Sequence, residues 1–293
     1  MTGTEPGTAD PFSAENEPQI RRVVVALDAT EQSVHLLEAA AELAQSMESE
    51  LVGIFVEDIN LLRLVELPFA YELGSFSTAR RPLQTLTLER QLRAQAATLR
   101  RMLMRVAEQH KLPWSFQVVR GVIATEVNKA TSESDLVILG RSRRTRTGAT
   151  PLGSTTRAVV VQAPPRLTLV LQRHIPRKQP VLVGYDGSSA AKRALSLATQ
   201  LLREQAAPLI LILISDEVGR ADALRQEVTN WLRLHGIEAR YHWLERANIE
   251  RLVNLVLMEQ GGAFVLPSEG LNLHDAALLT ILDLMQCPVL LVR

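Results

Sequence analysis

The sequence predicts an α/β fold made of two tandem, open, five-stranded parallel sheets flanked by helices. Two observations support this prediction. Short apolar and β-branched runs alternate with segments of helical periodicity, which is typical of parallel strands joined by crossover helices. The order found in the first half of the chain then starts again in the second. With 293 residues, 46% of them hydrophobic, the chain is long enough for two domains with a core each.

The first half alternates strands and helices in the order that a parallel sheet needs. It opens with the β-branched run 22–28, which ends in a carboxylate at Asp28, and a helix to about residue 47 follows. The later elements are predicted as strands over 51–56, 114–119, 136–139 and 167–171 and as helices over 86–110, 123–131 and 154–162. Because parallel neighbours need a crossover, each helix is expected to pack on the sheet.

The segment 59–84 interrupts this alternation. It is rich in Leu and aromatic residues, contains Pro68, Gly74 and Pro82, and is too long for an ordinary connection. Three roles are open for this insertion: a lid over a ligand site, part of a subunit interface, or an element that touches a membrane surface. The simplest alternative is that it packs on its own domain.

The second half repeats the order of the first after a short basic stretch. A strand over 180–185 again ends in a carboxylate, Asp186, followed by small hydroxyl residues that open a helix. The other elements are predicted as strands over 209–214, 238–243, 263–266 and 288–292 and as helices over 190–205, 222–235, 249–259 and 274–285. The predicted segments are thus a disordered tail, a first domain, a linker and a second domain, over 1–20, 21–172, 173–179 and 180–293.

Three features of the sequence favour a cytoplasmic protein: the polar start, the short apolar runs and the single cysteine. Residues 1–20 are polar and acidic and lack the apolar core of a secretory signal. The longest apolar runs, such as 209–214, are far shorter than the roughly 20 residues that a membrane-spanning helix needs. The single cysteine, Cys287, excludes an internal disulfide, which fits a reducing compartment.

The loop from Gly140 to Arg157 is the main candidate for a binding site. It joins the carboxyl end of a predicted buried strand to the amino end of a predicted helix, where ligands bind in open α/β sheets. Free backbone N–H groups and the positive end of the helix dipole converge there. Gly140 and Gly153 allow a ligand to approach the backbone closely, and Ser154 and Thr155 add hydroxyl donors. These features favour an anionic ligand.

The charge around this loop supports the same interpretation. From Leu136 to Tyr185 there is no Asp or Glu, whereas nine residues are basic; since the whole chain has 32 basic and 32 acidic residues, the remainder carries a formal charge of −9. A solvated arginine-rich loop that needs no ligand is the alternative. Nucleic acid is not an expected partner, because aromatic stacking residues are not interleaved with the arginines.

Two five-stranded units, each with an Asp after its first strand, and the Gly loop after the fourth strand resemble a tandem universal stress protein. The resemblance covers nearly the whole chain apart from the tail and 59–84, and it implies an adenine nucleotide alpha hydrolase-like fold. Many members of the family bind ATP through a loop of Gly, two residues, Gly, nine residues, Gly and then Ser or Thr. Here Gly140 takes the first place, Arg143 replaces the second Gly, and Gly153 and Ser154 form the last pair.

The resemblance also implies which other residues surround the nucleotide. It places Asp28 near the ribose or a phosphate-bound metal and Val52 beside the adenine. Arg141, Arg143 and Thr155 complete the loop's share of the predicted site. The implied ligand is ATP or another adenine nucleotide, accompanied by Mg²⁺ if it is a triphosphate.

Arg143 departs from the family pattern in a way that has two opposite effects. An arginine adds bulk and removes access to positive φ where a Gly would let backbone amides close on a triphosphate. It also adds a planar cation that is suited to phosphate. A smaller or different adenine nucleotide is therefore an alternative to ATP.

The second half departs further from the pattern. At the spacing of the family loop it has Pro267, Gly270 and then Thr280-Ile281. Only Gly270 therefore matches one of the four fixed positions of the pattern. Pro267 lacks an N–H donor, and Glu269 adds a negative charge where phosphates would lie. We expect this half to be structural and not to bind nucleotide, with Asp186 acting as a capping or turn residue.

No catalytic or metal-binding constellation is apparent. The six histidines show no metal-ligand spacing, and no nucleophile has an evident base, so at most a weak ATPase is expected. Two functions remain open: a stress-response regulatory protein whose first domain binds an adenine nucleotide, and an interaction protein that uses the insertion 59–84 or the basic loop to hold an unknown protein partner. A homodimer is compatible with both.

Overall fold

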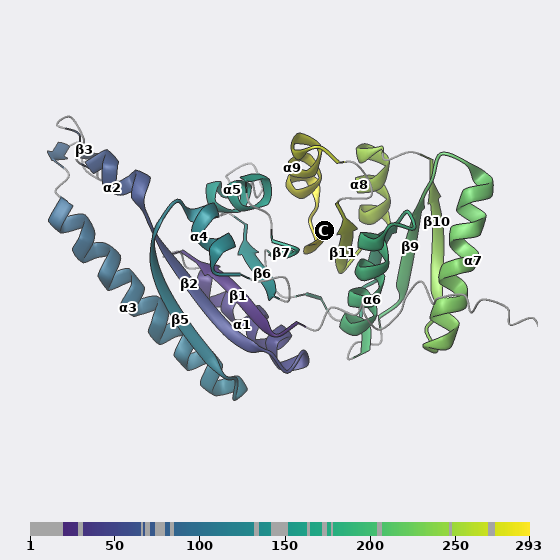
Figure 1. Ribbon diagram of the computed structural model, residues 1–293, viewed down its shortest axis with the longest axis horizontal. Coiled ribbons are helices and arrows are strands. Elements are labelled where there is room, and N and C mark those ends of the chain that lie inside the picture. Colours follow the sequence, from purple (N-terminus) through teal and green to yellow (C-terminus); the bar gives the residue numbers. More distant parts are fainter. Residues whose placement is uncertain are drawn as a thin grey trace, which may run out of the picture. The chain divides into compact units, whose positions relative to one another are not determined.

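The chain folds into two compact units, Ile20–Ile175 and Pro176–Arg293, in the computed structural model shown in Figure 1. The division falls within the linker expected at 173–179. The structure describes the following residues: 20–28, 32–65, 67, 71–73, 80–82, 85–131, 135–141, 152–162, 165–171, 175–176, 178–203, 207–245, 248–268 and 273–293.

The first unit contains a parallel sheet of five strands in the order β7-β6-β1-β2-β5. In chain order these strands are β1 (Arg22–Leu27), β2 (Glu50–Asp58), β5 (Trp114–Gly121), β6 (Asp135–Gly140) and β7 (Leu167–Leu171). Every residue of β7 and the first five of β6 are buried. Strands that are covered on both faces explain why the sequence reads as continuous apolar runs and not as alternation.

Four helices cover this sheet as two pairs. They are α1 (Gln32–Ser46), which contacts α3 (Thr85–His110), and α4 (Ile123–Lys129), which contacts α5 (Ser154–Gln162). The buried residues of α3 recur at helical spacing from Leu88 to Ala107, so the helix presents one apolar stripe to the sheet. Among the described residues no helix is both long enough and apolar enough to span a membrane.

The insertion 59–84 has secondary structure of its own. It begins with α2 (Ile59–Val65), which contacts α3 and β5, and it continues with an antiparallel pair formed by β3 (Tyr71–Leu73) and β4 (Arg80–Pro82). Leu62 and Val65 of α2 are buried, whereas Leu61 and Leu64 are 42% and 50% exposed. The insertion therefore packs in part on its own unit.

The second unit repeats the strand order of the first. Its parallel sheet runs β12-β11-β8-β9-β10, and each strand takes the place of the matching strand in the first unit. Its strands are β8 (Val181–Tyr185), β9 (Leu209–Ile214), β10 (Ala239–Leu244), β11 (Ala263–Pro267) and β12 (Val289–Val292). Its helices are α6 (Ser189–Arg203), α7 (Val218–Leu234), α8 (Ile249–Met258) and α9 (Asp275–Leu284). The predicted α/β fold class is confirmed.

The two units differ at the edge of the sheet where the strands end. Helix α3 has 26 residues and its counterpart α7 has 17. Thirteen residues connect β6 to α5, but only seven connect β11 to α9. Thr280 consequently lies inside α9 and not at its start, so the equivalence expected between Thr280-Ile281 and Gly153-Ser154 is wrong. The residue that precedes α9 is His274.

Candidate functional site

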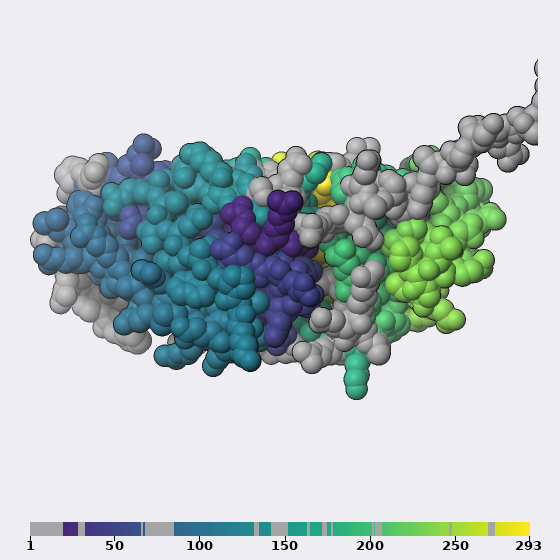
Figure 2. All heavy atoms as spheres, turned by 60° about the horizontal axis from the view of Figure 1, so that its bottom comes forward, coloured from purple at the N-terminus to yellow at the C-terminus, as the bar shows by residue number. Residues whose placement is uncertain are grey.

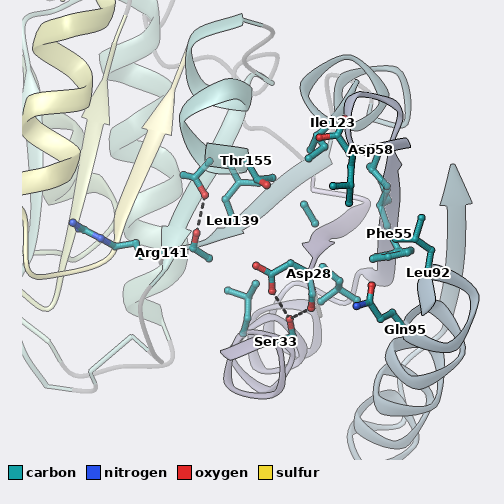
Figure 3. A pocket seen from close by; sticks show the side chains of 18 residues that line it. Asp28, Ser33, Phe55, Asp58, Leu92, Gln95, Ile123, Leu139, Arg141 and Thr155 are labelled. Atoms are coloured by element: carbon teal, nitrogen blue, oxygen red, sulfur yellow. Dashed lines mark hydrogen bonds between the residues drawn. The ribbon is translucent and has the colours of Figure 1, made fainter. Parts of the chain in front are cut away.

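A cavity of about 340 Å³ opens in the first unit where β1, β2 and β6 end (Figure 3). Its walls come from three strands and from helices α1, α2, α3, α4 and α5. The lining residues are Ala26, Leu27, Asp28, Ser33, Leu36, Ile54, Phe55, Val56, Asp58, Leu61, Leu92, Gln95, Ile123, Leu139, Gly140, Arg141, Thr155 and Thr156. The cavity thus lies where ligands bind in open α/β sheets, and its size is that of a small-molecule site.

Asp28 is held at one side of this cavity by the first turn of α1. The buried Ser33 hydroxyl donates hydrogen bonds to the backbone oxygen of Asp28 at 2.5 Å and to its carboxylate Oδ1 at 3.0 Å. Asp28 itself is exposed, and Figure 3 shows its carboxylate beside Ser33. The serine therefore fixes the position of Asp28 relative to α1.

The opposite side is formed by the end of β6 and the start of α5. The backbone N–H of Arg141 donates to the Leu171 oxygen at 2.9 Å, which continues the sheet one residue past Gly140. The Thr156 hydroxyl donates to the Gly140 oxygen at 2.7 Å, which fixes the first turn of α5 against the strand. As a result the amino end of α5, through Thr155 and Thr156, faces the same cavity as Asp28.

The structure brings together only part of the predicted nucleotide site. Asp28, Gly140, Arg141 and Thr155 line the cavity. Gly153 and Ser154 open α5 next to Thr155 but are not lining residues. Arg143 lies outside the described residues.

Val52 does not line the cavity. It is buried in β2, where it pairs with Val24 of β1, four residues before Asp28. The residues of β2 that line the cavity are Ile54, Phe55, Val56 and Asp58, because the cavity lies at the carboxyl end of the sheet. The expected contact between Val52 and an adenine stays a prediction, and Ile54 is the nearest lining residue along the same side of the strand.

Several lining residues were missed by sequence reasoning. Leu92 and Gln95 come from the first turns of α3, and Figure 3 shows the Gln95 amide directed from that helix toward the cavity. Asp58 lies at the end of β2, where its Oδ1 accepts from the Asn60 N–H at 2.9 Å, and Leu61 of α2 follows. The length of α3 was the one available signal, because its extra turns at the amino end reach over the strand ends.

The charges that face the cavity are mostly negative in the described part of the site. The lining includes the carboxylates of Asp28 and Asp58, and Figure 3 shows the Arg141 side chain directed away from them. The described residues contain no group of three or more His, Cys, Asp or Glu that could hold a metal ion. Apolar walls and hydrogen-bonding groups in this region suit an uncharged ring and hydroxyls, whereas an anion is favoured only at the amino end of α5.

A network of charged side chains joins three elements around the cavity. Arg120 of β5 contacts Glu57 of β2 at 2.8 Å and Glu89 of α3 at 3.4 Å. The hydrogen bond to Glu57, followed by the attraction of that carboxylate, raises the pKa of Arg120 above its ordinary value. Since Glu57 precedes Asp58 and Glu89 lies one turn before Leu92, the network links two parts of the cavity wall.

The model of the Universal stress protein family matches residues 19–170, more than half of the chain. The chain belongs to the universal stress protein family. The match coincides with the first unit, which holds the cavity, and the model does not extend to the second unit. No curated protein matches the sequence.

Solved structures resemble the chain over its whole length. A universal stress protein from Archaeoglobus fulgidus DSM 4304 aligns with 94% of this chain and 99% of its own, at 16% identity and a TM-score of 0.73. A putative universal stress protein from Pseudomonas aeruginosa UCBPP-PA14 aligns with 96% of this chain and 95% of its own, at 14% identity and a TM-score of 0.58. At these identities the likeness shows the fold.

Proposed function

We propose that the first unit binds an adenine nucleotide and that the protein acts as a nucleotide-responsive regulatory protein of the stress response, not as an enzyme. The observation that carries the proposal is the cavity at the ends of β1, β2 and β6, which Asp28 and the amino end of α5 face from opposite sides. A carboxylate acceptor and a cluster of N–H donors across one cavity match the two ends of a nucleotide, sugar hydroxyls and phosphate.

The geometry supports a specific division of the ligand between these walls. The base packs against the apolar surface of Leu36, Ile54 and Phe55, and the ribose hydroxyls donate to Asp28. The phosphates extend toward the N–H groups at Gly153–Thr155. With a triphosphate, Mg²⁺ would arrive on the phosphates, with Asp28 and Asp58 as the nearby carboxylates.

We infer that the second unit is a degenerate tandem copy with a structural role. Its Asp186 carboxylate accepts from the Ser188 N–H at 2.9 Å, so it serves the turn that opens α6. Pro267 takes the place of Gly140, and its Cδ lies 3.3 Å from where a Cβ on Gly184 would stand. Together with the shorter connection before α9, these features support a second unit that does not bind nucleotide.

Analysis of the small molecules released from the freshly purified protein tests the proposal. The protein is denatured, and the supernatant is analysed by chromatography and mass spectrometry, for wild type and Gly153→Asp. The introduced carboxylate repels a phosphate but is a favourable residue at the amino end of a helix, so α5 is retained. We expect a stoichiometric adenine nucleotide from wild type and at least about tenfold less from the variant. No released nucleotide, together with no thermal shift on adding ATP and magnesium, contradicts the proposal.

A second candidate function is an interaction protein that does not bind nucleotide. The exposed leucines at the start of the insertion favour it: Leu64 is 50% and Leu67 is 41% exposed, more than a purely internal role needs. The same experiment separates the two functions, because this candidate predicts neither a released nucleotide nor a thermal shift.

A further inference from the structure

The outward face of α3 carries a row of arginines. The helix contains five Arg, two Glu and no Lys, and the arginines are Arg90, Arg93, Arg100, Arg101 and Arg105. All five are exposed, and Figure 2 shows α3, in blue to teal, at the surface of the first unit. At 100° per residue the five side chains fall within an arc of about 140°, opposite the buried stripe. The row is about 22 Å long.

Most of these charges are not neutralised by the protein. Arg93 approaches Glu89 at 3.7 Å, but its side chain is 73% exposed, so this ion pair contributes little. Arg90, Arg100 and Arg105 make no hydrogen bond or ion pair with any residue that the structure describes. The face therefore presents three guanidinium groups, spread across the arc of about 140°, that have no partner among the described residues.

The clustering of arginines on α3 is more than a solvent-exposed helix face needs. Arg90 and Arg93 are three residues apart, and Arg101 and Arg105 are four apart, spacings at which like charges destabilise a helix. Helix α7, which occupies the same place in the second unit, balances three Arg with two acidic residues. The excess of positive charge is therefore a property of α3 and points to an anionic partner.

The residue types on this face of α3 indicate what kind of anionic partner it binds. Five arginines and no lysine favour phosphate groups, which the planar guanidinium contacts through two donors. Leu86 and Met104 lie on the same face and are 68% and 37% exposed. Apolar side chains beside cations are stabilised at a lipid–water interface, where both the phosphates and the acyl boundary are present. A nucleic acid backbone offers nothing comparable to the leucine and the methionine.

We propose that the arginine face of α3 binds an anionic phospholipid surface. The arginines lie at the lipid phosphates, and Leu86 and Met104 enter the boundary between headgroups and acyl chains. Each arginine close to an anionic bilayer strengthens binding by about fivefold. The face lies opposite Leu92, which lines the cavity, so this proposal is independent of nucleotide binding.

Flotation of the full chain with lipid vesicles tests the proposal. Wild type is mixed with phosphatidylcholine vesicles that contain or lack phosphatidylglycerol, at low and at physiological salt. The test variant combines Arg90→Gln, Arg100→Gln and Arg105→Gln. The control combines Arg220→Gln, Arg233→Gln and Arg251→Gln, which removes three exposed arginines from α7 and α8 and leaves the same net charge. A further variant, Leu86→Ser, tests the apolar contact with the bilayer. Retention on duplex DNA, at a phosphate concentration equal to that of the vesicles, tests the alternative polyanion.

The expected result is flotation of wild type with the phosphatidylglycerol vesicles only, weakened by salt. Binding falls by about a hundredfold in the α3 triple variant and remains in the control. Leu86→Ser weakens vesicle binding without changing DNA retention. The proposal is overturned if wild type does not float, if both triple variants lose binding equally, or if DNA is bound in preference to the vesicles.

Discussion

Asp28 is the residue on which the proposed ligand chemistry depends most directly. Its carboxylate is exposed to the cavity and is oriented by Ser33. A hydrogen bond from a sugar hydroxyl to a carboxylate is worth about 1.5–3 kcal/mol, because one partner is charged. We therefore predict that Asp28→Asn lowers the affinity for the adenine nucleotide by about 10- to 100-fold, as measured by isothermal titration calorimetry.

Asp186→Asn is the matched control for this prediction. Asp186 occupies the same place after the first strand of the second unit, but its carboxylate serves the backbone N–H of Ser188. Its substitution is expected to leave the affinity unchanged. Equal affinity for wild type and Asp28→Asn would remove Asp28 from the ligand site.

Tyr185 makes the stability of the second unit sensitive to alkaline pH. Burial is the main cause that raises the pKa of its hydroxyl, and the nearby carboxylates of Glu227 and Asp186 add to it. Because the pKa is higher in the folded state, the free energy of unfolding is unaffected by this group below the unfolded pKa near 10.0. Above that pH the unfolded state loses its proton more readily than the folded state, and the free energy of unfolding falls. The side chain is fully buried, so the phenolate cannot form without exposing it.

We predict that Tyr185→Phe removes this loss. The hydroxyl makes no hydrogen bond of ordinary geometry with the described residues, so the substitution changes the free energy of unfolding near neutral pH by no more than about 1 kcal/mol. Urea unfolding of wild type and variant, at about pH 8 and about pH 11, measures the difference. Tyr241→Phe is the control, because the hydroxyl of Tyr241, on the partly exposed strand β10, contacts Thr229 of α7. Equal alkaline losses in both variants would contradict the assignment to Tyr185.

Sequence reasoning at the residue scale identified the cavity residues that carry a recognisable pattern. Asp28, Gly140 and Thr155 follow strand ends or open a helix, and local sequence fixes both features. Gln95 belongs to no motif, and it reaches the cavity because α3 packs on β2 and β5. Tertiary packing, which the sequence pattern does not encode, selects residues of this kind.

At the scale of elements, the charged network of Arg120 is expected to hold the first turns of α3 over the cavity. Arg120 bridges Glu57, which is 8% exposed, and Glu89 in those turns. We predict that Arg120→Gln accelerates hydrogen exchange in the amino-terminal turns of α3 and weakens nucleotide binding, because Leu92 and Gln95 lose their fixed position.

The second half of the chain offers a matched control. Arg240 of β10 forms an ion pair with Glu259 at 2.8 Å, and neither residue lines the cavity. Arg240→Gln is expected to leave exchange in α3 and the nucleotide affinity unaltered. If Arg120→Gln also leaves both unaltered, the network does not position the cavity wall.

The elements themselves were predictable where hydrophobic periodicity is strong. The helices predicted over 86–110 and 154–162 correspond to α3 and α5 within one residue, since local patterns decide helices of this kind. The insertion was harder, because its apolar residues follow neither period, and it contains α2 and a β3–β4 pair. The equivalence of Thr280-Ile281 with Gly153-Ser154 was wrong because spacing was counted through a connection that is shorter in the second unit.

At the scale of the whole molecule, the two units share a fold and differ in the connections where their strands end. Both units have the same strand order, and the repeat was visible in the sequence because buried strands keep their apolar runs. The family model matches only residues 19–170. Connections at the strand ends are exposed and free to change, so we expect Pro267 and the shorter connection between β11 and α9 to change ligand binding there without altering the fold.

Hydrogen exchange of the full chain with and without saturating adenine nucleotide tests the central claim most directly, since it reports both binding and its location. At a concentration of about a hundred times the dissociation constant, a ligand stabilises the unit that binds it by about 2.7 kcal/mol. We predict slower exchange at the ends of β1, β2 and β6 and in the first turn of α5, with no change in the second unit. Protection in the second unit, or nowhere in the chain, would contradict a nucleotide site in the first.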